Sequence, residues 1–204
     1  MAFKSVSNNS FGPVKWLLSE TTDEWLIQAI SNPLEVLLDH AHCERKAAGF
    51  AFQLMFRYMD EPYLSEVLSP LVREELEHFE RVLHLLKSKG KELKRLPAPP
   101  YGSILSSQIR KNEPYRMLDS FLVAGLIEAR SYERMSLLAE HSKDNDLRAL
   151  YQDLKHSEAK HFGIYWNLAE KHFDREVLIA RLDQLSIVEA NILSKLYPEP
   201  RIHS

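Results

Sequence analysis

The sequence predicts an all-α protein: a four-helix bundle with a long crossover between its two helix pairs, plus a short N-terminal helix and a C-terminal helix. Apolar residues recur at intervals of three and four along most of the chain, which is typical of amphipathic helices. Glycine is scarce, with six in 204 residues, and no segment shows the alternation expected of a strand. Because neither helix pair alone could close a four-sided core, we expect a single domain over 1–204.

The first helix pair is expected to follow a short helix over 22–30. Asn32 and Pro33 suit an N-cap and a first helical position, and they begin a helix that extends to about residue 59. Pro62 follows a brief break and begins a second helix that ends near Gly90. The short connection makes these two helices antiparallel neighbours.

A proline-rich segment over 90–113 connects the two pairs. We expect it to be irregular and to run the length of the bundle, so that the second pair docks beside the first. The remaining helices are expected from Pro114 to about 141, from a cap at Asp144, Asn145 or Asp146 to about 173, and from Asp174, as a cap, to a point before Pro198.

Composition excludes several classes of site. Cys43 is the single cysteine, so the chain cannot form an internal disulfide, a zinc site built on thiolates or an iron–sulfur cluster. No segment approaches the roughly 20 apolar residues of a membrane-spanning helix, and the first residues lack the apolar core of a signal peptide. We therefore expect a cytoplasmic protein that does not enter a membrane.

The pattern Glu-x-x-His occurs twice, at Glu75 to His78 and at Glu158 to His161. About one such pair is expected by chance from 20 Glu and 9 His, so the motif alone carries little weight. A lone glutamate precedes each motif at nearly the same interval, because Glu44 lies 31 residues before Glu75 and Glu128 lies 30 residues before Glu158. Each helix pair therefore repeats one Glu followed by Glu-x-x-His.

The neighbours of these residues indicate that all six face the interior. Positions three, four and seven residues away are largely apolar on all four helices. Four carboxylates and two imidazoles buried without partners would be very unfavourable, so cations are expected among them. Two divalent ions would balance four carboxylates, and oxygen and imidazole ligands suit iron or manganese. The candidate metal ligands are Glu44, Glu75, His78, Glu128, Glu158 and His161.

Residues near the candidate ligands and the remaining histidines have other expected roles. Glu74 and Ser157 each precede a motif glutamate and could orient the ligand histidines. Cys43 is expected to be structural, and packing is the expected role of Tyr132, Tyr151 and Tyr165. The histidines outside the repeat are expected at the surface or as hydrogen-bonded core residues rather than as ligands: His40, His42, His84, His141, His156, His172 and His203.

Four segments of the chain resemble one known family. They are DHAHCERKAA from Asp39, REELEHF from Arg73, EARSYE from Glu128 and SEAKHF from Ser157. In these segments the chain is similar to the ferritin-like, di-iron tRNA 2-methylthio-isopentenyladenosine hydroxylases, the MiaE family. The resemblance implies a monooxygenase that uses dioxygen to hydroxylate the isopentenyl side chain of a modified adenosine beside the tRNA anticodon.

The resemblance also implies a cofactor of two iron ions. Glu44 and Glu128 would be terminal ligands, and Glu75 and Glu158 could bridge the irons. His78 and His161 would complete one iron each. The chain departs from the larger multicomponent di-iron hydroxylases, which carry a threonine where this sequence has Tyr132. Two electrons must come from outside, since no dinucleotide-binding glycine motif or cysteine cluster is present, and a separate reductase is therefore expected as a partner.

Positive charge is concentrated in one segment of a chain whose net charge is −3. The segment from residue 87 to residue 116 contains eight basic and two acidic residues, so its net charge is +6. The rest of the chain contains 18 basic and 27 acidic residues, so its net charge is −9. Such a segment can collect the phosphates of tRNA, although a helix C-terminus alone also favours lysines. The candidate tRNA-binding residues are Lys87, Lys89, Lys91, Lys94, Arg95, Arg110, Lys111 and Arg116.

Three other functions share parts of this pattern. An iron-storage or detoxifying ferroxidase would use the same six ligands in a shell of many copies. A di-iron hydroxylase of another substrate, such as a quinone, would need an amphipathic helix that faces a membrane. In a purely structural bundle without metal, some of the glutamates would lie on solvated faces.

Overall fold

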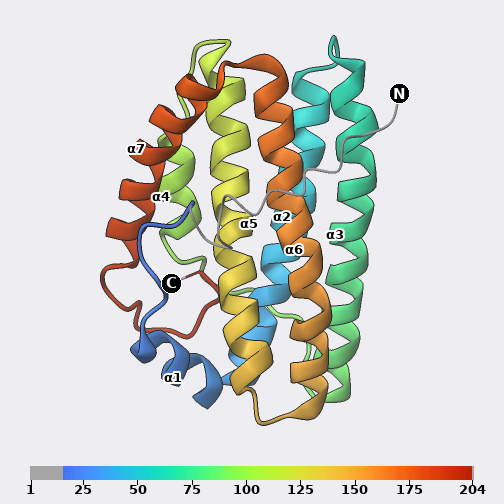
Figure 1. The fold of residues 1–204 in the computed structure, drawn as a ribbon. Helices are drawn as coiled ribbons and strands as arrows, with labels where there is room; N and C mark the ends of the chain where they lie inside the picture. The colour runs from blue at the N-terminus through green and yellow to red at the C-terminus, as the bar shows by residue number, and fades with distance from the viewer. Residues whose placement is uncertain (1–15, 204) are drawn as a thin grey trace.

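The computed structural model describes residues 16–203, and this part of the chain is helical, with no strand (Figure 1). Its helices are α1 (Asp23–Ser31), α2 (Pro33–Arg57), α3 (Pro62–Ser88), α4 (Tyr101–Ser107), α5 (Tyr115–His141), α6 (Asn145–His172) and α7 (Arg175–Leu193). The all-α prediction is confirmed, and each of the six expected helices is present within a few residues of its expected bounds.

The four long helices α2, α3, α5 and α6 form the bundle (Figure 1). α2 packs along α3 and α5 packs along α6, each pair antiparallel, and α3 also contacts α6. α7 lies against α4, α5 and α6, while α1 crosses one end of the bundle and contacts α2 and α5. The flanking helices thus cover the α5 side of the bundle.

The crossover between α3 and α5 contains a helix that the sequence did not predict. The expectation of a wholly irregular segment was wrong over Tyr101–Ser107, where α4 forms and packs against α7. Its Tyr101 and Leu105 side chains are buried. α4 has only seven residues, with prolines before it and Gly102 inside it, so no periodic run identifies it in the sequence.

The chain after α7 returns to the bundle. Trp25 in α1 donates a hydrogen bond from Nε1 to the carbonyl oxygen of Arg201 at 3.0 Å. The backbone N–H of Ile202 donates to Asp39 Oδ2 in α2 at 2.9 Å, and the Ile202 side chain is buried. The C-terminal segment therefore links α1 to α2.

The predicted helix caps are partly confirmed. Asp144 caps α6, since its Oδ1 accepts hydrogen bonds from the N–H groups of Asp146 and Leu147 at 2.9 and 3.3 Å. Asn32 lies at the N-cap of α2 but makes no capping bond with its side chain, which instead donates to the Gln28 carbonyl at 2.9 Å. Pro33 at the first helical position lacks an N–H and so reduces the need for a cap.

Two hydrophobic clusters fill the bundle, and the predicted ligand layer lies between them. One cluster includes Leu64 to Leu71 of α3 and Tyr165 to Ala169 of α6. The other includes Val82 to Leu86 of α3 and Leu147 to Leu154 of α6. The Glu-x-x-His motifs fall between these stretches in both helices. Leu85 lies seven residues after His78, where an inward-facing position is expected, but it is only partly buried, and Leu86 takes the core position in α3 instead.

A buried ion pair joins α7 to α5. Arg130 donates from Nε and Nη2 to the two carboxylate oxygens of Glu189 at 2.8 and 2.9 Å, and both side chains are fully buried. Tyr101 of α4 donates its hydroxyl to the same carboxylate at 3.2 Å. These contacts connect α4 and α7 to α5 within the core.

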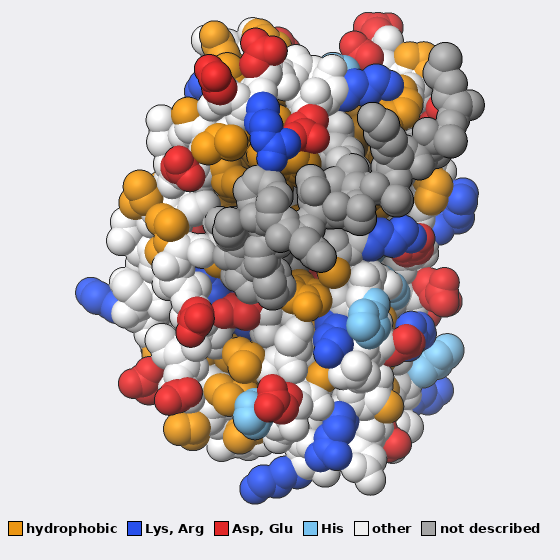
Figure 2. Space-filling model, viewed as in Figure 1, with side chains coloured by type: hydrophobic (Ala, Val, Ile, Leu, Met, Phe, Trp, Pro, Cys, Tyr) orange, Lys and Arg blue, Asp and Glu red, His pale blue; other side chains and the backbone are white. Residues whose placement is uncertain are grey.

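The surface in view is mixed in charge. In Figure 2, outside the grey atoms, Lys and Arg side chains are interspersed with Asp and Glu, and no broad area carries one sign. Within the described part of the chain, no helix combines the length and the apolar character needed to cross a membrane.

Gly125 in α5 provides a test of this packing. A Cβ at this position would lie 2.5 and 2.8 Å from two ring atoms of Trp16. We expect Gly125→Ala to lower the free energy of unfolding by about 1–3 kcal/mol, the usual effect of overpacking. Gly49→Ala in α2 is the matched control, since its Cβ would meet no atom within 4 Å, and it should raise stability by about 0.5–1 kcal/mol. Chemical denaturation of both variants would check this, and equal effects would contradict it.

Candidate metal centre

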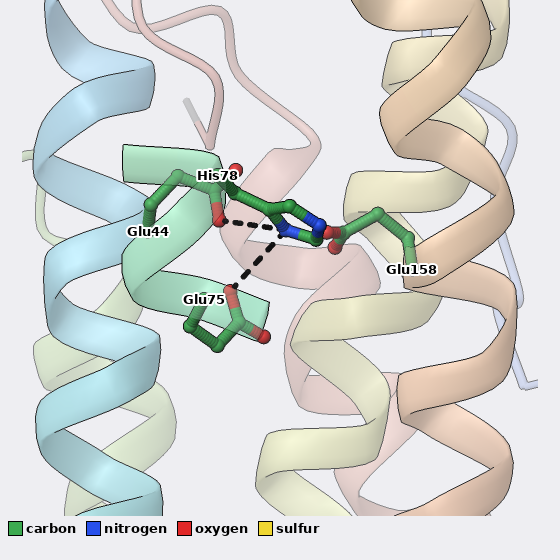
Figure 3. Close-up of side chains that lie close together, drawn as sticks. All are labelled: Glu44, Glu75, His78 and Glu158. Carbon is green, nitrogen blue, oxygen red and sulfur yellow. Dashed lines mark ion pairs between the residues drawn. The ribbon is translucent and has the colours of Figure 1, made fainter. Parts of the chain in front are cut away.

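The structure brings the six predicted ligands together in the middle of the bundle. Glu44 comes from α2, Glu75 and His78 from α3, Glu128 from α5, and Glu158 and His161 from α6. Each side chain is at most 5% exposed. Figure 3 shows four of them, which converge from α2, α3 and α6 on the space between the helices.

The six residues form two groups that share Glu75. One ligand atom from each of Glu44, Glu75, His78 and Glu158 lies within 4.8 Å of the others, and the same holds for Glu75, Glu128 and His161. His78 Nδ1 lies 3.7 Å from Glu44 Oε2 and 3.9 Å from Glu75 Oε2 (Figure 3). His161 Nδ1 lies 2.8 Å from Glu75 Oε1. Glu75 therefore stands between a group with His78 and a group with His161.

Several buried atoms of the cluster have no hydrogen-bond partner among the described residues. They include Glu75 Oε1, His78 Nδ1 and His161 Nδ1. His161 Nδ1 and Glu75 Oε1 are close, but they are not oriented for a hydrogen bond. A buried polar atom without a partner costs about 1–3 kcal/mol, and such atoms are rare in folded proteins. A pair of metal ions would satisfy these atoms together, and the donors fit that use.

The carboxylates raise one another's proton affinity. Burial, followed by the charges of Glu128 and Glu44, raises the pKa of Glu75 well above its ordinary value. Burial and then Glu158 raise the pKa of Glu128 in the same direction. Burial and the Glu44 charge raise the pKa of Glu158 to about 7. Such shifts indicate negative charge that the described residues do not balance.

Glu44 differs from the other carboxylates because it is hydrogen-bonded to His40, a histidine outside the predicted ligand set. Burial alone would raise its pKa, but the imidazole of His40 lowers it, through charge and a hydrogen bond between His40 Nε2 and Glu44 Oε1. The His40 ring is fully buried and stacks on Tyr151 with ring centres 5.6 Å apart. His40 was not predicted to take part in the site. His40 lies four residues before Glu44, which places both side chains on one face of the helix. This spacing is the feature of the sequence that could have identified the contact.

One of the two predicted orienting residues contacts a ligand. Glu74 Oε2 lies 3.1 Å from His161 Nε2, and Glu74 Oε1 accepts from Lys160 Nζ at 2.7 Å. Hydrogen bonding of this kind fixes the orientation of a ligand histidine and leaves Nδ1 facing the cluster. Within the described residues, no hydrogen bond links the Ser157 side chain to His78 or His161, so the corresponding prediction for Ser157 was wrong.

Five of the other histidines occupy the two kinds of position expected, whereas His172 is half-buried and its Nε2 has no hydrogen-bond partner among the described residues. His84, His141 and His156 are exposed. The buried His42 is hydrogen-bonded through Nε2 to the Lys94 carbonyl at 2.8 Å, and the buried His203 is bonded to Ser131 Oγ at 3.0 Å.

An apolar cavity of about 590 Å³ extends to the cluster. α2, α4, α5 and the C-terminal segment contribute its walls, including Phe50, Val123 and Ile127. Glu128 and Tyr165 line it as well, so the cavity reaches one of the candidate ligands. Tyr165 is buried in a hydrophobic cluster, which confirms packing and adds a role in shaping the cavity.

The eight predicted tRNA-binding residues do not form one surface. Several are engaged within the chain: Lys89 with Asp144 and Asp146 at 2.7 Å, Lys91 with Glu35 at 3.7 Å, and Arg110 with the buried Asp119 at 2.7 Å. Lys87 and Lys111 are exposed, and Arg116 is half-buried. Lys94 and Arg95 line a second cavity beside the apolar one. Arg45 and Lys46 of α2, which lie outside the charged segment of the sequence, line it too.

The raised pKa of Glu158 predicts how the metal-free protein responds to pH. The folded chain holds a proton on Glu158 up to about pH 7, whereas the unfolded chain releases it near 4.5. This contribution to stability is therefore present below about pH 4.5 and is lost as pH rises through 7. In chelator-treated protein, Glu158→Gln should remove it, so melting temperatures of wild type and variant should converge as pH falls from 7.5 to 5. Parallel curves would contradict a shifted Glu158.

Curated proteins and solved structures are similar to this chain. The tRNA 2-(methylsulfanyl)-N(6)-isopentenyladenosine(37) hydroxylase of Pseudomonas putida is 35% identical over 184 residues, which cover 90% of this chain and 89% of that protein. The Salmonella typhimurium protein of the same name is 26% identical, and the match covers 94% of this chain and 88% of that protein. A Synechococcus structure described as Protein 43 with aldehyde deformylating oxygenase activity is 59% identical, with a TM-score of 0.91 over 94% of this chain and 96% of its own.

The family model described as tRNA-(MS2IO6A)-hydroxylase (MiaE) matches residues 11–204. This match spans nearly the whole chain, and the resemblance drawn from the four sequence segments agrees with it. The chain belongs to the MiaE family.

Proposed function

We propose that this protein is a di-iron monooxygenase that hydroxylates the isopentenyl side chain of 2-methylthio-isopentenyladenosine next to the anticodon of tRNA. The observation that carries the proposal is the apolar cavity that reaches Glu128 of the buried cluster. A branched hydrocarbon side chain suits such a cavity, and the names of both curated relatives specify an isopentenyladenosine substrate. A tRNA substrate agrees with the cytoplasmic location expected from the sequence.

The two groups of ligands suggest how the chain would hold two iron ions. Glu44 and His78 would serve one ion, Glu128 and His161 the other, and Glu75 would be shared. Glu158 belongs to the first group and lies against Glu128, so it is placed to respond to either ion. His40 and Glu74 act as positioning residues for Glu44 and His161. Reduced iron would supply the activation of dioxygen that hydroxylation of a C–H bond requires.

The residues around the cluster would bind the substrate and exclude water. Phe50, Val123 and Ile127 offer an apolar surface to the isopentenyl group, whose burial there is favourable by about 0.8 kcal/mol per CH₂. Because Glu128 lines the cavity, the end of that group would approach the cluster there. The electrons would come from an external reductase, as expected from the sequence.

The shared position of Glu75 predicts unequal losses of iron among variants. Glu75→Ala should abolish binding of both ions, because it removes a donor from both groups. Glu44→Ala should leave about one ion per chain. Glu77→Ala is the matched control, since Glu77 is exposed on the same helix, and it should bind iron as wild type does. Elemental analysis after anaerobic ferrous loading gives the count, and a Glu75→Ala protein that retains two ions would contradict the shared ligand.

The activity itself is tested with purified, iron-loaded protein, a chemical reductant and tRNA that carries the unhydroxylated nucleoside. Mass spectrometry of the digested tRNA should show one added oxygen atom that derives from labelled dioxygen. Glu75→Ala should give no product. If the nucleoside remains unhydroxylated after incubation with the fully iron-loaded enzyme, the proposal is contradicted.

Aldehyde deformylation is the second candidate, favoured by the 59% identity to the Synechococcus protein described with that activity. The same apolar cavity offers space for an aliphatic chain. Under identical conditions a long-chain aldehyde should then release formate, and comparison of kcat/KM for the two substrates decides between the candidates.

A further inference from the structure

A second cavity, of about 470 Å³, lies beside the apolar one. α2 contributes His42, Arg45 and Lys46 to its wall, and the start of the crossover contributes Lys94 and Arg95. Asp39, Lys46 and Ala98 line both cavities. The two spaces are therefore adjacent, and one of them is basic while the other is apolar.

The basic cavity carries a strong excess of positive charge. Arg45, Lys46, Lys94 and Arg95 give four cationic groups in a protein whose net charge is −3. Asp39 is the one carboxylate among the residues that line it, and it is only 2% exposed. Its Oδ2 accepts the hydrogen bond from the Ile202 N–H, and its Oδ1 lies 3.8 Å from Arg201. The carboxylate is thus occupied by the C-terminal segment.

A buried histidine holds the two sides of the basic cavity together. His42 Nε2 is bonded to the Lys94 carbonyl, which fixes the crossover against α2. Its Nδ1 lies 3.0 Å from Nη2 of Arg45. His42 is 8% exposed. The cationic side chains from α2 and from the crossover are therefore set around one space by a shared contact.

We propose that Arg45, Lys46, Lys94 and Arg95 form a phosphate-binding mouth that holds the RNA backbone of the nucleotides flanking the modified adenosine. The inference rests on the proposed function and specifies how its substrate is bound. A base turned out of a single-stranded loop leaves its neighbouring phosphates outside. With the isopentenyl group in the apolar cavity, those phosphates meet the adjacent basic one.

Only part of the basic segment predicted from the sequence belongs to this mouth. Lys94 and Arg95 belong to it, and no ion pair engages either side chain within the described residues. Lys89, Lys91 and Arg110 instead pair with carboxylates of the chain. Arg45 and Lys46 complete the mouth from α2, directly after the candidate ligand Glu44. Cations at the mouth and a ligand in the cluster are thus carried by one helix.

The test compares two ligands on the iron-loaded protein. One is an anticodon stem-loop RNA with 2-methylthio-isopentenyladenosine, and the other is the free nucleoside, which has no phosphate. The mouth variant is Lys94→Gln/Arg95→Gln, with Lys46→Gln as a second variant on α2. The matched control is Lys143→Gln/Lys195→Gln, which makes the same charge change at exposed residues that line neither cavity.

The mouth variant should bind the stem-loop about tenfold more weakly at low salt, and the slope of log Kd against log salt should fall by about 0.7 for each phosphate that is no longer neutralised. Its affinity for the nucleoside and its iron content should match wild type, and the control should match wild type throughout. Three outcomes would contradict phosphate binding by these residues. The control could lose as much stem-loop affinity as the mouth variant, the mouth variants could keep the wild-type affinity and salt slope, or the mouth variant could lose nucleoside affinity to the same extent as stem-loop affinity. A wild-type protein that binds neither ligand would instead overturn the proposed function.

Discussion

The fold is organised around the burial of four carboxylates and two imidazoles in one layer of an apolar bundle. Charges in such a layer are very unfavourable unless cations or protons balance them. The raised pKa values of Glu75, Glu128 and Glu158 show that the described residues do not supply that balance. His40 supplies part of it at Glu44. Two metal ions would supply the rest, and the unpartnered atoms of Glu75, His78 and His161 are where they would bind.

The rest of the structure packs tightly around this layer of ligands and leaves a cavity that reaches it from one side. Hydrophobic clusters pack against it toward both ends of the bundle, so the ligand side chains cannot move apart without disturbing the core. α4 and the C-terminal segment are held by the Arg130–Glu189 pair, Tyr101 and Asp39. These same segments form walls of the apolar cavity. Contacts that stabilise the flank of the bundle therefore also define the route to the cluster.

The bundle, its crossover and the assembly of the six candidate ligands could be predicted from the sequence because they depend on helical periodicity and on a repeat within each helix pair. α4 could not, since its seven residues gain their conformation from packing on α7. The path of the C-terminal segment depends on single hydrogen bonds to Trp25 and Asp39, which leave no periodic signal. Arg45 and Lys46 join Lys94 and Arg95 only through tertiary structure, so a count of charge along the chain could not group these four residues.

The central claim is that the buried layer binds two metal ions that share Glu75. Anomalous diffraction at the iron edge from iron-loaded crystals tests it most directly. We expect two peaks per chain, one beside Glu44 and His78 and the other beside Glu128 and His161, each in contact with a Glu75 oxygen. A single peak, peaks outside the layer, or a Glu75 carboxylate that contacts neither ion would contradict this claim.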